Sequence, residues 1–345
     1  DRYGNRRDRN RARLKFLINE WGIEEFTKRY FEEKSLAKST RSGVYETFKI
    51  EWQEEVAPES VAAFSTTDTG LAGFDKWKKT NVIEQKQNGY NCVYIRCLYG
   101  DLTPDQARAV AQIARDFGGG RLRSSITQNM ILRWIPTAAL PSVFERLSKA
   151  GIAERNAETI ADITRCPGAD TCNLAITHSK GLARDLTEKV FSNGFLDDAE
   201  VQNISIKISG CTNSCGQHHI ANIGFYGGSR SLDGKQLPHY QMLIGGRTGL
   251  TREDVKFGDR IAMIPARRIS EAVRHLLNLY KKNKQGDESF IQWSDREGKA
   301  YLVSEMKPFS DMEPLKSHGD AMFEDLGDDS GEAFKVAVGK GECAA

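Results

Sequence analysis

Four cysteines in two short segments carry the clearest chemical signal in this chain of 345 residues. Cys166 and Cys172 lie in the sequence CPGADTC, and Cys211 and Cys215 lie in GCTNSCG, with 38 residues between the two pairs. Iron in iron–sulfur clusters is held by cysteine thiolates, and four of them suit one cluster. The pattern therefore indicates an iron–sulfur site built from two loops.

Zinc is the main alternative for four cysteines. Structural zinc sites usually take their thiolates from C-x2-4-C turns, whereas the first pair here is spaced C-x5-C. A dithiol redox motif would be C-x-x-C, and a catalytic thiol would need a partner histidine. The spacing favours iron–sulfur, but zinc and unligated structural cysteines stay open at this point.

The residues around the cysteines support a bulky cofactor. Gly210 precedes Cys211 and Gly216 follows Cys215, so the backbone can approach a ligand closely. The side-chain amide of Asn213 lies between the two thiolates, where we expect it to donate a hydrogen bond to a sulfur or a ligand. Pro167 and Gly168 hold the first loop in a tight path.

The remaining cysteines do not suggest a disulfide framework, because the total of seven is odd. Cys97 is expected on the same strand face as Val93 and Ile95, and we interpret it and Cys92 as small buried hydrophobic residues. Cys343 is left over.

The bulk composition fits a globular protein of two or three domains. The chain is 39% hydrophobic, has a net charge of +2, and has no apolar run near the ~20 residues that span a bilayer. Its N-terminus has no apolar core that would serve as a signal peptide. The lack of a signal peptide and of a membrane span, together with thiol-dependent metal chemistry, predicts a cytoplasmic protein with no membrane partner. The chain also starts without Met, which suggests a fragment or a processed subunit.

The hydrophobic pattern predicts a compact β-α-β-β-α unit in the first half of the chain. Residues 11–33 are expected to be helical, and residues 34–84 are expected to connect with little core of their own. A strand follows from Tyr90, and a helix begins after Thr103 and ends at Gly118. Two short strands and a second helix complete the unit.

A second unit carries the cysteines. A helix follows CPGADTC and ends at Gly194, and the strand VQNISIKIS runs directly into GCTNSCG. HIANIGFYGG and HYQMLIGG read as further strands, and a helix with Ile269 and Tyr280 follows them. Residues 306–345 are expected to be acidic and loop-like, with a strand at FKVAV.

The combination of C-x5-C with GCTNSCGQ resembles the siroheme-dependent sulfite and nitrite reductases, over nearly the whole chain. The resemblance implies an α+β protein in which a ferredoxin-like half-domain precedes a mixed α/β siroheme and 4Fe–4S domain. It implies that Cys166, Cys172, Cys211 and Cys215 bind the cluster and that Cys215 also bridges to the siroheme iron. It further places Gln128, Ala175 and Asn213 beside the siroheme.

The basic N-terminus allows three interpretations. It is rich in arginine, including Arg6, Arg7 and Arg11. Such a run is commonly a solvated surface, and the resemblance implies that these residues bind the siroheme carboxylates. Nucleic-acid binding is the least favoured interpretation, because no aromatic residues are interleaved for stacking on bases.

Two further motifs bear on electron and proton supply. His218 and His219 would point to opposite faces of a strand, so at most one reaches the site, and ordinary packing is favoured for both. No GxGxxG sequence lies at a strand–helix junction, so we expect neither NADPH nor flavin to bind here. Electrons would then come from a ferredoxin or a separate flavoprotein.

The resemblance also suggests boundaries and a missing part. We expect the tail of a preceding repeat at residues 1–45 and a linker at 46–84. The ferredoxin-like half-domain is expected at 85–150, the siroheme/4Fe–4S domain at 155–285 and a C-terminal extension at 286–345. The Arg and Lys residues that grip the substrate in the family have no counterpart here. We therefore expect a fragment with weak siroheme retention and little activity, and possible partnership with the missing N-terminal half.

Three functional hypotheses follow. The leading one is a part of an enzyme that reduces sulfite to sulfide or nitrite to ammonia in a six-electron reaction. The second is an iron–sulfur module that passes electrons to a partner without substrate chemistry of its own. The third is a zinc-stabilised domain with no redox role.

Overall fold

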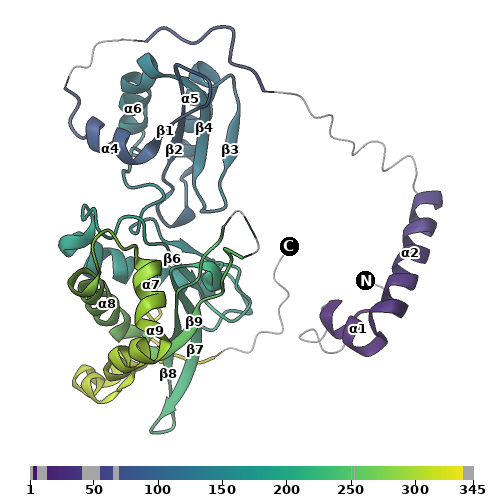
Figure 1. Cartoon of the computed structure of the whole chain (residues 1–345), viewed down its shortest axis with the longest axis vertical. Helices are drawn as coiled ribbons and strands as arrows, with labels where there is room; N and C mark the ends of the chain where they lie inside the picture. The colour runs from purple at the N-terminus through teal and green to yellow at the C-terminus, as the bar shows by residue number, and fades with distance from the viewer. Residues whose placement is uncertain are drawn as a thin grey trace. The chain divides into compact units, whose positions relative to one another are not determined.

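The computed structural model describes residues 3–5, 14–40, 55–64, 70–249, 251 and 253–336, and divides into two compact units at residues 56 and 57. In the first unit, helices α1 (Leu14–Trp21) and α2 (Ile23–Thr40) are joined at Gly22 (Figure 1). A single helix was predicted, but Gly22 has φ +79°, the left-handed region that glycine adopts easily, and the helix breaks there.

The second unit begins with a four-stranded antiparallel sheet in the order β1-β2-β4-β3. Helices α5 and α6 pack together against it (Figure 1). The strands are β1 (Val82–Glu84), β2 (Tyr90–Ile95), β3 (Leu122–Ser124) and β4 (Met130–Pro136), and the helices are α5 (Pro104–Phe117) and α6 (Leu140–Lys149). The predicted β-α-β-β-α order is confirmed, with one more helix and strand before it.

Helix α5 shows why the local prediction succeeded. The Thr103 hydroxyl accepts a hydrogen bond from the Gln106 backbone N–H at 3.2 Å, and the Gln106 side chain accepts one from the Thr103 N–H at 3.0 Å. This capping box satisfies two N–H groups that the first helical turn leaves open. Pro104 occupies the first turn, and Gly118 closes the helix, as predicted.

The prediction that residues 34–84 lack a core was wrong for their last part. Helix α4 (Phe74–Asn81) precedes β1, and its Trp77 is only 1% exposed, packed with its ring centroid 5.1 Å from that of Phe144. The sequence FDKWKKTN is rich in lysine, so its two inward aromatic residues did not produce a recognisable helical pattern.

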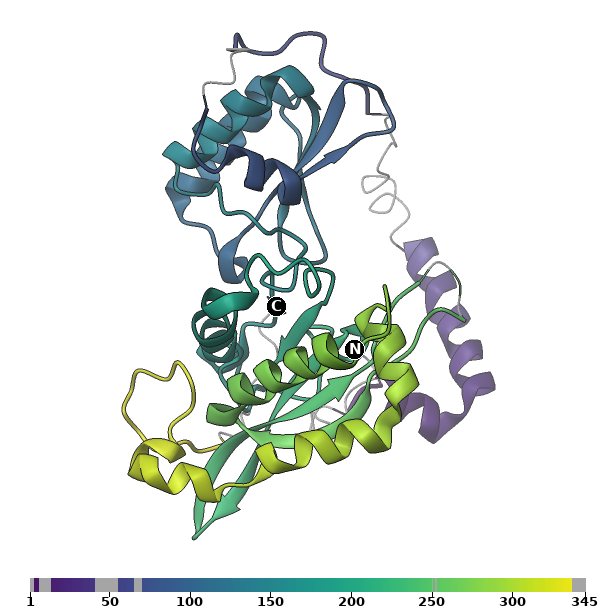
Figure 2. The ribbon, with the colours of Figure 1, turned by 60° about the vertical axis from the view of Figure 1, so that its left-hand side comes forward.

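The cysteine-bearing part is a five-stranded sheet whose strands follow the chain order β5 to β9. Strands β5, β6 and β7 are parallel, and β7, β8 and β9 are antiparallel. Helices α8 and α9 lie side by side across one face (Figure 2), and α7 contributes to the same core.

Strands β5 to β9 are, in order, Thr164–Arg165, Ile206–Ser209, Ile223–Leu232, Lys235–Ile244 and Asp259–Pro265. The helices are α7 (Ser179–Leu186), α8 (Ile269–Asn283) and α9 (Phe290–Met306), and a π-helical turn at Thr187–Phe195 continues α7.

The predicted C-terminal extension from residue 286 starts inside this domain, so the expected boundary was wrong. Helix α9 begins at a capping box between Ser289 and Gln292, and its Trp293 is fully buried in the core. Residues Lys307–Ser310 and Glu313–Phe323 form 3-10 turns. Of the predicted FKVAV strand, residues 334–336 are not strand and the last two residues lie outside the described chain.

The α+β class, with a ferredoxin-like unit before a mixed domain, is confirmed. Across the part of the chain that the structure describes, no helix combines the length and apolarity needed to span a bilayer.

Candidate iron–sulfur site

The two cysteine loops leave adjacent parallel strands. Strand β5 pairs with β6, and the ladder continues one step further because the Cys166 N–H donates to the Ile208 carbonyl at 3.0 Å. Cys166 opens the first loop at the carboxyl end of β5, and Cys211 follows the end of β6. The sheet therefore brings together two segments that are 38 residues apart in the sequence.

Three glycines allow the cysteine loops to approach neighbouring backbone closely. A Cβ at Gly168 would lie 2.5 Å from the Ser179 nitrogen, and one at Gly216 would lie 2.0 Å from the Ile208 carbonyl oxygen. A Cβ at Gly210 would lie 2.6 Å from the Thr177 carbonyl oxygen. These are backbone contacts that cannot move aside. These glycines therefore let the cysteine loops approach the start of α7, the backbone at Thr177 and strand β6 closely.

Backbone N–H groups point at the sulfur atoms. The Gly210 N–H donates to the Cys166 Sγ at 3.1 Å. Burial is the main effect on the Cys211 thiol and raises its pKa. The Cys211 sulfur also accepts a hydrogen bond from the backbone of Asn213, which lowers the pKa and partly offsets the effect of burial. Such donors stabilise the thiolate form that binds metal. The sequence predicted a hydrogen bond from the Asn213 side chain to a sulfur or a ligand, and the structure shows a hydrogen bond to the Cys211 sulfur from the Asn213 main chain.

The four thiols share one electrostatic environment. Charges on Cys166, Cys215 and Cys172 each raise the pKa of Cys211, because like charges disfavour one another at short range. Cys166 is buried, Cys172 and Cys211 are half-buried, and Cys215 is exposed. No disulfide joins any of the six cysteines that the structure describes.

Zinc and an iron–sulfur cluster place different demands on four thiols. Within the described residues, no three His, Cys, Asp or Glu side chains are close enough to bind one metal ion. A zinc site gathers its four ligands around a single ion, whereas in a 4Fe–4S cluster each thiolate binds a different iron.

The residues predicted to contact siroheme have structural partners within the chain. Gln128 adopts φ +72°, and its Oε1 accepts a hydrogen bond from the Arg165 N–H at 3.0 Å. Ala175 is buried against Gly210, where an added Cβ would lie 3.1 Å from the Ala175 Cβ. Both residues thus lie at the cysteine loops. Arg6, Arg7 and Arg11 lie outside the described residues.

The histidine pair differs from its prediction because residues 218–220 form a 3-10 turn instead of a strand. The two rings then lie on the same side, with centroids 4.2 Å apart. His218 is fully buried, and its Nδ1 lies 2.8 Å from the Ser209 hydroxyl. Burial lowers the pKa of His218 to about 4, so this ring is neutral at pH 7.

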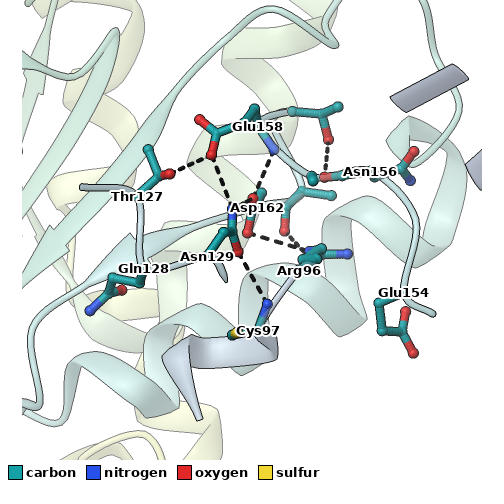
Figure 3. A network of polar contacts seen from close by, with 12 residues as sticks. Arg96, Cys97, Thr127, Gln128, Asn129, Glu154, Asn156, Glu158 and Asp162 are labelled. Atoms are coloured by element: carbon teal, nitrogen blue, oxygen red, sulfur yellow. Dashed lines mark hydrogen bonds and ion pairs between the residues drawn. The ribbon is translucent and has the colours of Figure 1, made fainter. Parts of the chain in front are cut away.

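The sequence did not reveal a polar network between the ferredoxin-like half-domain and the cysteine domain (Figure 3). Arg96, just after β2, donates to the Asp162 carboxylate at 3.4 Å and to the Arg155 carbonyl at 3.1 Å. Asn129 donates to Asp162 at 2.6 Å and to Glu158 at 3.1 Å. Burial raises the pKa of Asp162, and the charge of Arg96 opposes that shift.

Two buried cations at the site were also missed. Lys207 on β6 donates to Gln217 at 3.2 Å, and burial lowers the pKa of its amine. Arg165 on β5 donates to the Cys166 carbonyl at 3.2 Å. In the sequence both read as polar members of short strands, and nothing in the local pattern shows that they are buried.

The fold and the site together define an iron–sulfur protein with a ferredoxin-like half-domain joined to a cluster-bearing domain. The family described as "Nitrite/Sulfite reductase ferredoxin-like half domain" matches residues 83–150, and "Nitrite and sulphite reductase 4Fe-4S domain" matches residues 156–306. The chain belongs to the siroheme-dependent sulfite and nitrite reductase family, whose cofactors are a 4Fe–4S cluster and siroheme.

Individual relatives support this assignment. The chain is 28% identical over 281 residues to a ferredoxin–nitrite reductase of Synechococcus elongatus, covering 79% of this chain and 47% of the relative. It is 27% identical over 300 residues to a sulfite reductase [ferredoxin] of Mycobacterium tuberculosis, covering 84% and 48%. The solved structure of Mycobacterium tuberculosis NirA has the same fold, with a TM-score of 0.58 and 24% identity over 87% of this chain and 50% of that one. The chain thus spans about half the length of these relatives.

Proposed function

We propose that this chain is the cluster-bearing part of an oxidoreductase that reduces sulfite to sulfide or nitrite to ammonia. The observation that carries the proposal is the convergence of four thiols at the ends of two parallel strands, with backbone N–H groups donating to two of the sulfurs. Cys166, Cys172, Cys211 and Cys215 are the proposed cluster ligands.

Cys215 is the proposed bridge to the second cofactor. It is the exposed member of the four, so its sulfur is accessible to a group outside the cluster loops. When bound, siroheme would supply the iron at which the substrate is reduced. A thiolate shared between cluster and siroheme iron would couple the two electronically, which suits a reaction that receives six electrons one at a time.

The remaining roles follow from the same proposal. Gln128, Ala175 and Asn213 would line the siroheme, and Arg6, Arg7 and Arg11 would bind its carboxylates through charge-assisted hydrogen bonds. A ferredoxin is the proposed electron donor, since both relatives named above are ferredoxin enzymes by name. Turnover by this chain alone is expected to be weak, because it spans about half the length of those relatives.

The ligand set is tested by replacing cysteines in the full chain. Cys172→Ser and Cys211→Ser should each abolish the electron paramagnetic resonance signal of the reduced cluster and lower the iron content. Cys92→Ser is the matched control, because Cys92 is also half-buried but lies on β2 of the other domain. An unchanged cluster signal in Cys211→Ser would rule out the ligand set.

An electron-transfer module without substrate chemistry of its own is the second candidate. The absorption spectrum of the chain supplied with siroheme distinguishes the two candidates. A siroheme band that is lost in Cys215→Ser, while iron is retained in part, supports the reductase. A cluster signal with no siroheme binding at all supports the electron-transfer module.

A further inference from the structure

Arg165 is a buried cation placed directly before the first proposed cluster ligand. Its side chain is 5% exposed, and it donates from Nη1 to the Cys166 carbonyl at 3.2 Å and from Nη2 to Asp101 at 3.4 Å. Its Nε is buried and has no hydrogen-bond partner among the residues that the structure describes. Nothing in the proposed function requires an arginine at this position.

The charge of Arg165 is only partly compensated. Its carboxylate partner Asp101 is 58% exposed and also pairs with Lys180 at 2.8 Å. Burying a guanidinium costs free energy unless a partner is held close. Burial accordingly lowers the pKa of Arg165, while Asp101, Asp170 and Cys166 raise it and Arg184 lowers it further. Because an arginine pKa starts so high, the group stays charged, and it places a buried positive charge next to the cysteine loop.

The ferredoxin-like half-domain holds Arg165 in place from two sides. The Gln128 side chain accepts the Arg165 backbone N–H at 3.0 Å and packs on Gly100, where an added Cβ would lie 3.4 Å from it. Asp101, the next residue, binds the guanidinium. Both contacts come from loops of that half-domain, so its position decides how the charge of Arg165 is oriented and balanced.

We propose that Arg165 raises the reduction potential of the cluster, and that Asp101 of the ferredoxin-like half-domain limits this effect. The proposal rests on the proposed cluster ligands. Uptake of one electron adds one negative charge to the cluster, so a nearby cation stabilises the reduced form more than the oxidised form. In a buried site this interaction is screened less than in water. The ferredoxin-like half-domain thus has an electrostatic role in addition to a structural one.

A purely structural role for Arg165 would give a different result. If the residue only joined the two domains, removing either member of the Arg165–Asp101 pair would loosen the same contact and disturb the cluster in the same way. If its charge acts on the cluster, the two removals have opposite signs, because one deletes a positive and the other a negative charge.

The experiment is a redox titration of the full chain carrying its reconstituted cluster, with dithionite as the reductant and electron paramagnetic resonance as the readout. Arg165→Gln should lower the midpoint potential, and Asp101→Asn should raise it. A tenfold change in the ratio of reduced to oxidised cluster at a fixed potential corresponds to about 59 mV for one electron. Arg165→Lys keeps the charge and should restore most of the wild-type potential.

Arg108→Gln is the matched control, because Arg108 lies on α5 of the ferredoxin-like half-domain and its side chain is 75% exposed. This replacement should leave the midpoint potential of the cluster unchanged. Shifts of the same sign in Arg165→Gln and Asp101→Asn, or no shift in either, would overturn the proposal. If Arg165→Gln does not retain a cluster, Asp101→Asn decides, since its partly exposed site tolerates an isosteric change. A wild-type chain without any cluster signal would instead refute the proposed function.

Discussion

At the scale of single residues, the cysteine domain contains a histidine whose charge state is fixed by burial. His239 on β8 is fully buried, and its Nδ1 donates to the Leu237 carbonyl at 2.9 Å, since a carbonyl only accepts. Its Nε2 is buried without a hydrogen-bond partner in the described chain. Burial lowers the pKa of His239 to about 4, so the folded protein keeps this ring neutral.

This pKa predicts how stability depends on pH. An unfolded histidine binds a proton near pH 6.5, so between pH 6.5 and 4 the unfolded state carries one more proton at this position, and stability falls as the pH falls. Replacing His239 with Gln should reduce the loss in unfolding free energy between pH 7.5 and 5 by about 1–2 kcal/mol. Urea unfolding of the wild type and the variant at the two pH values measures this loss in unfolding free energy.

One opposing group must be considered in that comparison. Burial raises the pKa of Asp325 to about 6, so it gains a proton in the folded state first and stabilises the protein as the pH falls. Because wild type and His239→Gln share Asp325, its contribution cancels in the difference. Equal pH dependence in the two proteins would show that His239 is not kept neutral by the fold.

At the scale of helices and strands, what the sequence predicted depended on how local the signal was. Helix α5 was predicted with both ends because a cap, an inward stripe and a terminal glycine lie within one segment. Helices α4 and α9 were missed. Helix α4 is short and lysine-rich, and α9 contains Gly298 with φ +79°, which interrupts its regular pattern. Their burial depends on partners far away in the sequence, which periodicity cannot show.

Helix α4 gives a prediction at this scale. Trp77 packs on Phe74 and Phe144 in the core of the ferredoxin-like half-domain. Trp77→Ala leaves a cavity there and should lower the free energy of unfolding by about 3–5 kcal/mol. Hydrogen exchange of the β1 and β2 amides, together with chemical denaturation, measures the effect.

The control is Ile83→Ala on the adjacent strand β1, where the side chain is 52% exposed and should cost less than about 0.5 kcal/mol. If Trp77→Ala cost no more than this control, α4 would be a peripheral helix and the original linker assignment would be correct after all.

At the scale of the molecule, the candidate site divides into a part that sequence reveals and a part that it does not. The cysteines lie in two short motifs whose composition is informative by itself. Arg96 and Asp162 are 66 residues apart, and each is an ordinary charged residue in its local sequence. Only the docking of the half-domain onto residues 155–162 brings them together. Arg96 also donates to the Ala161 carbonyl, so it holds the backbone that leads into β5 and the first cysteine.

The Arg96–Asp162 pair yields the last prediction, because both side chains are only 6% exposed. Removing Arg96 leaves a buried carboxylate without its cation, and Arg96→Met should lower the free energy of unfolding by about 3–5 kcal/mol at pH 8. The pKa of Asp162 is already raised by burial and rises further without Arg96. A raised carboxyl pKa stabilises the folded state at low pH and loses that effect as the pH rises, so the penalty should be smaller at pH 5. Denaturant unfolding at the two pH values measures this. The control is the exposed Arg108→Met, whose effect on the unfolding free energy should be the same at pH 8 and pH 5. If the penalty for Arg96→Met were also equal at the two pH values, Asp162 would stay ionised in the variant. Arg96 would then act only through the backbone carbonyls to which it donates.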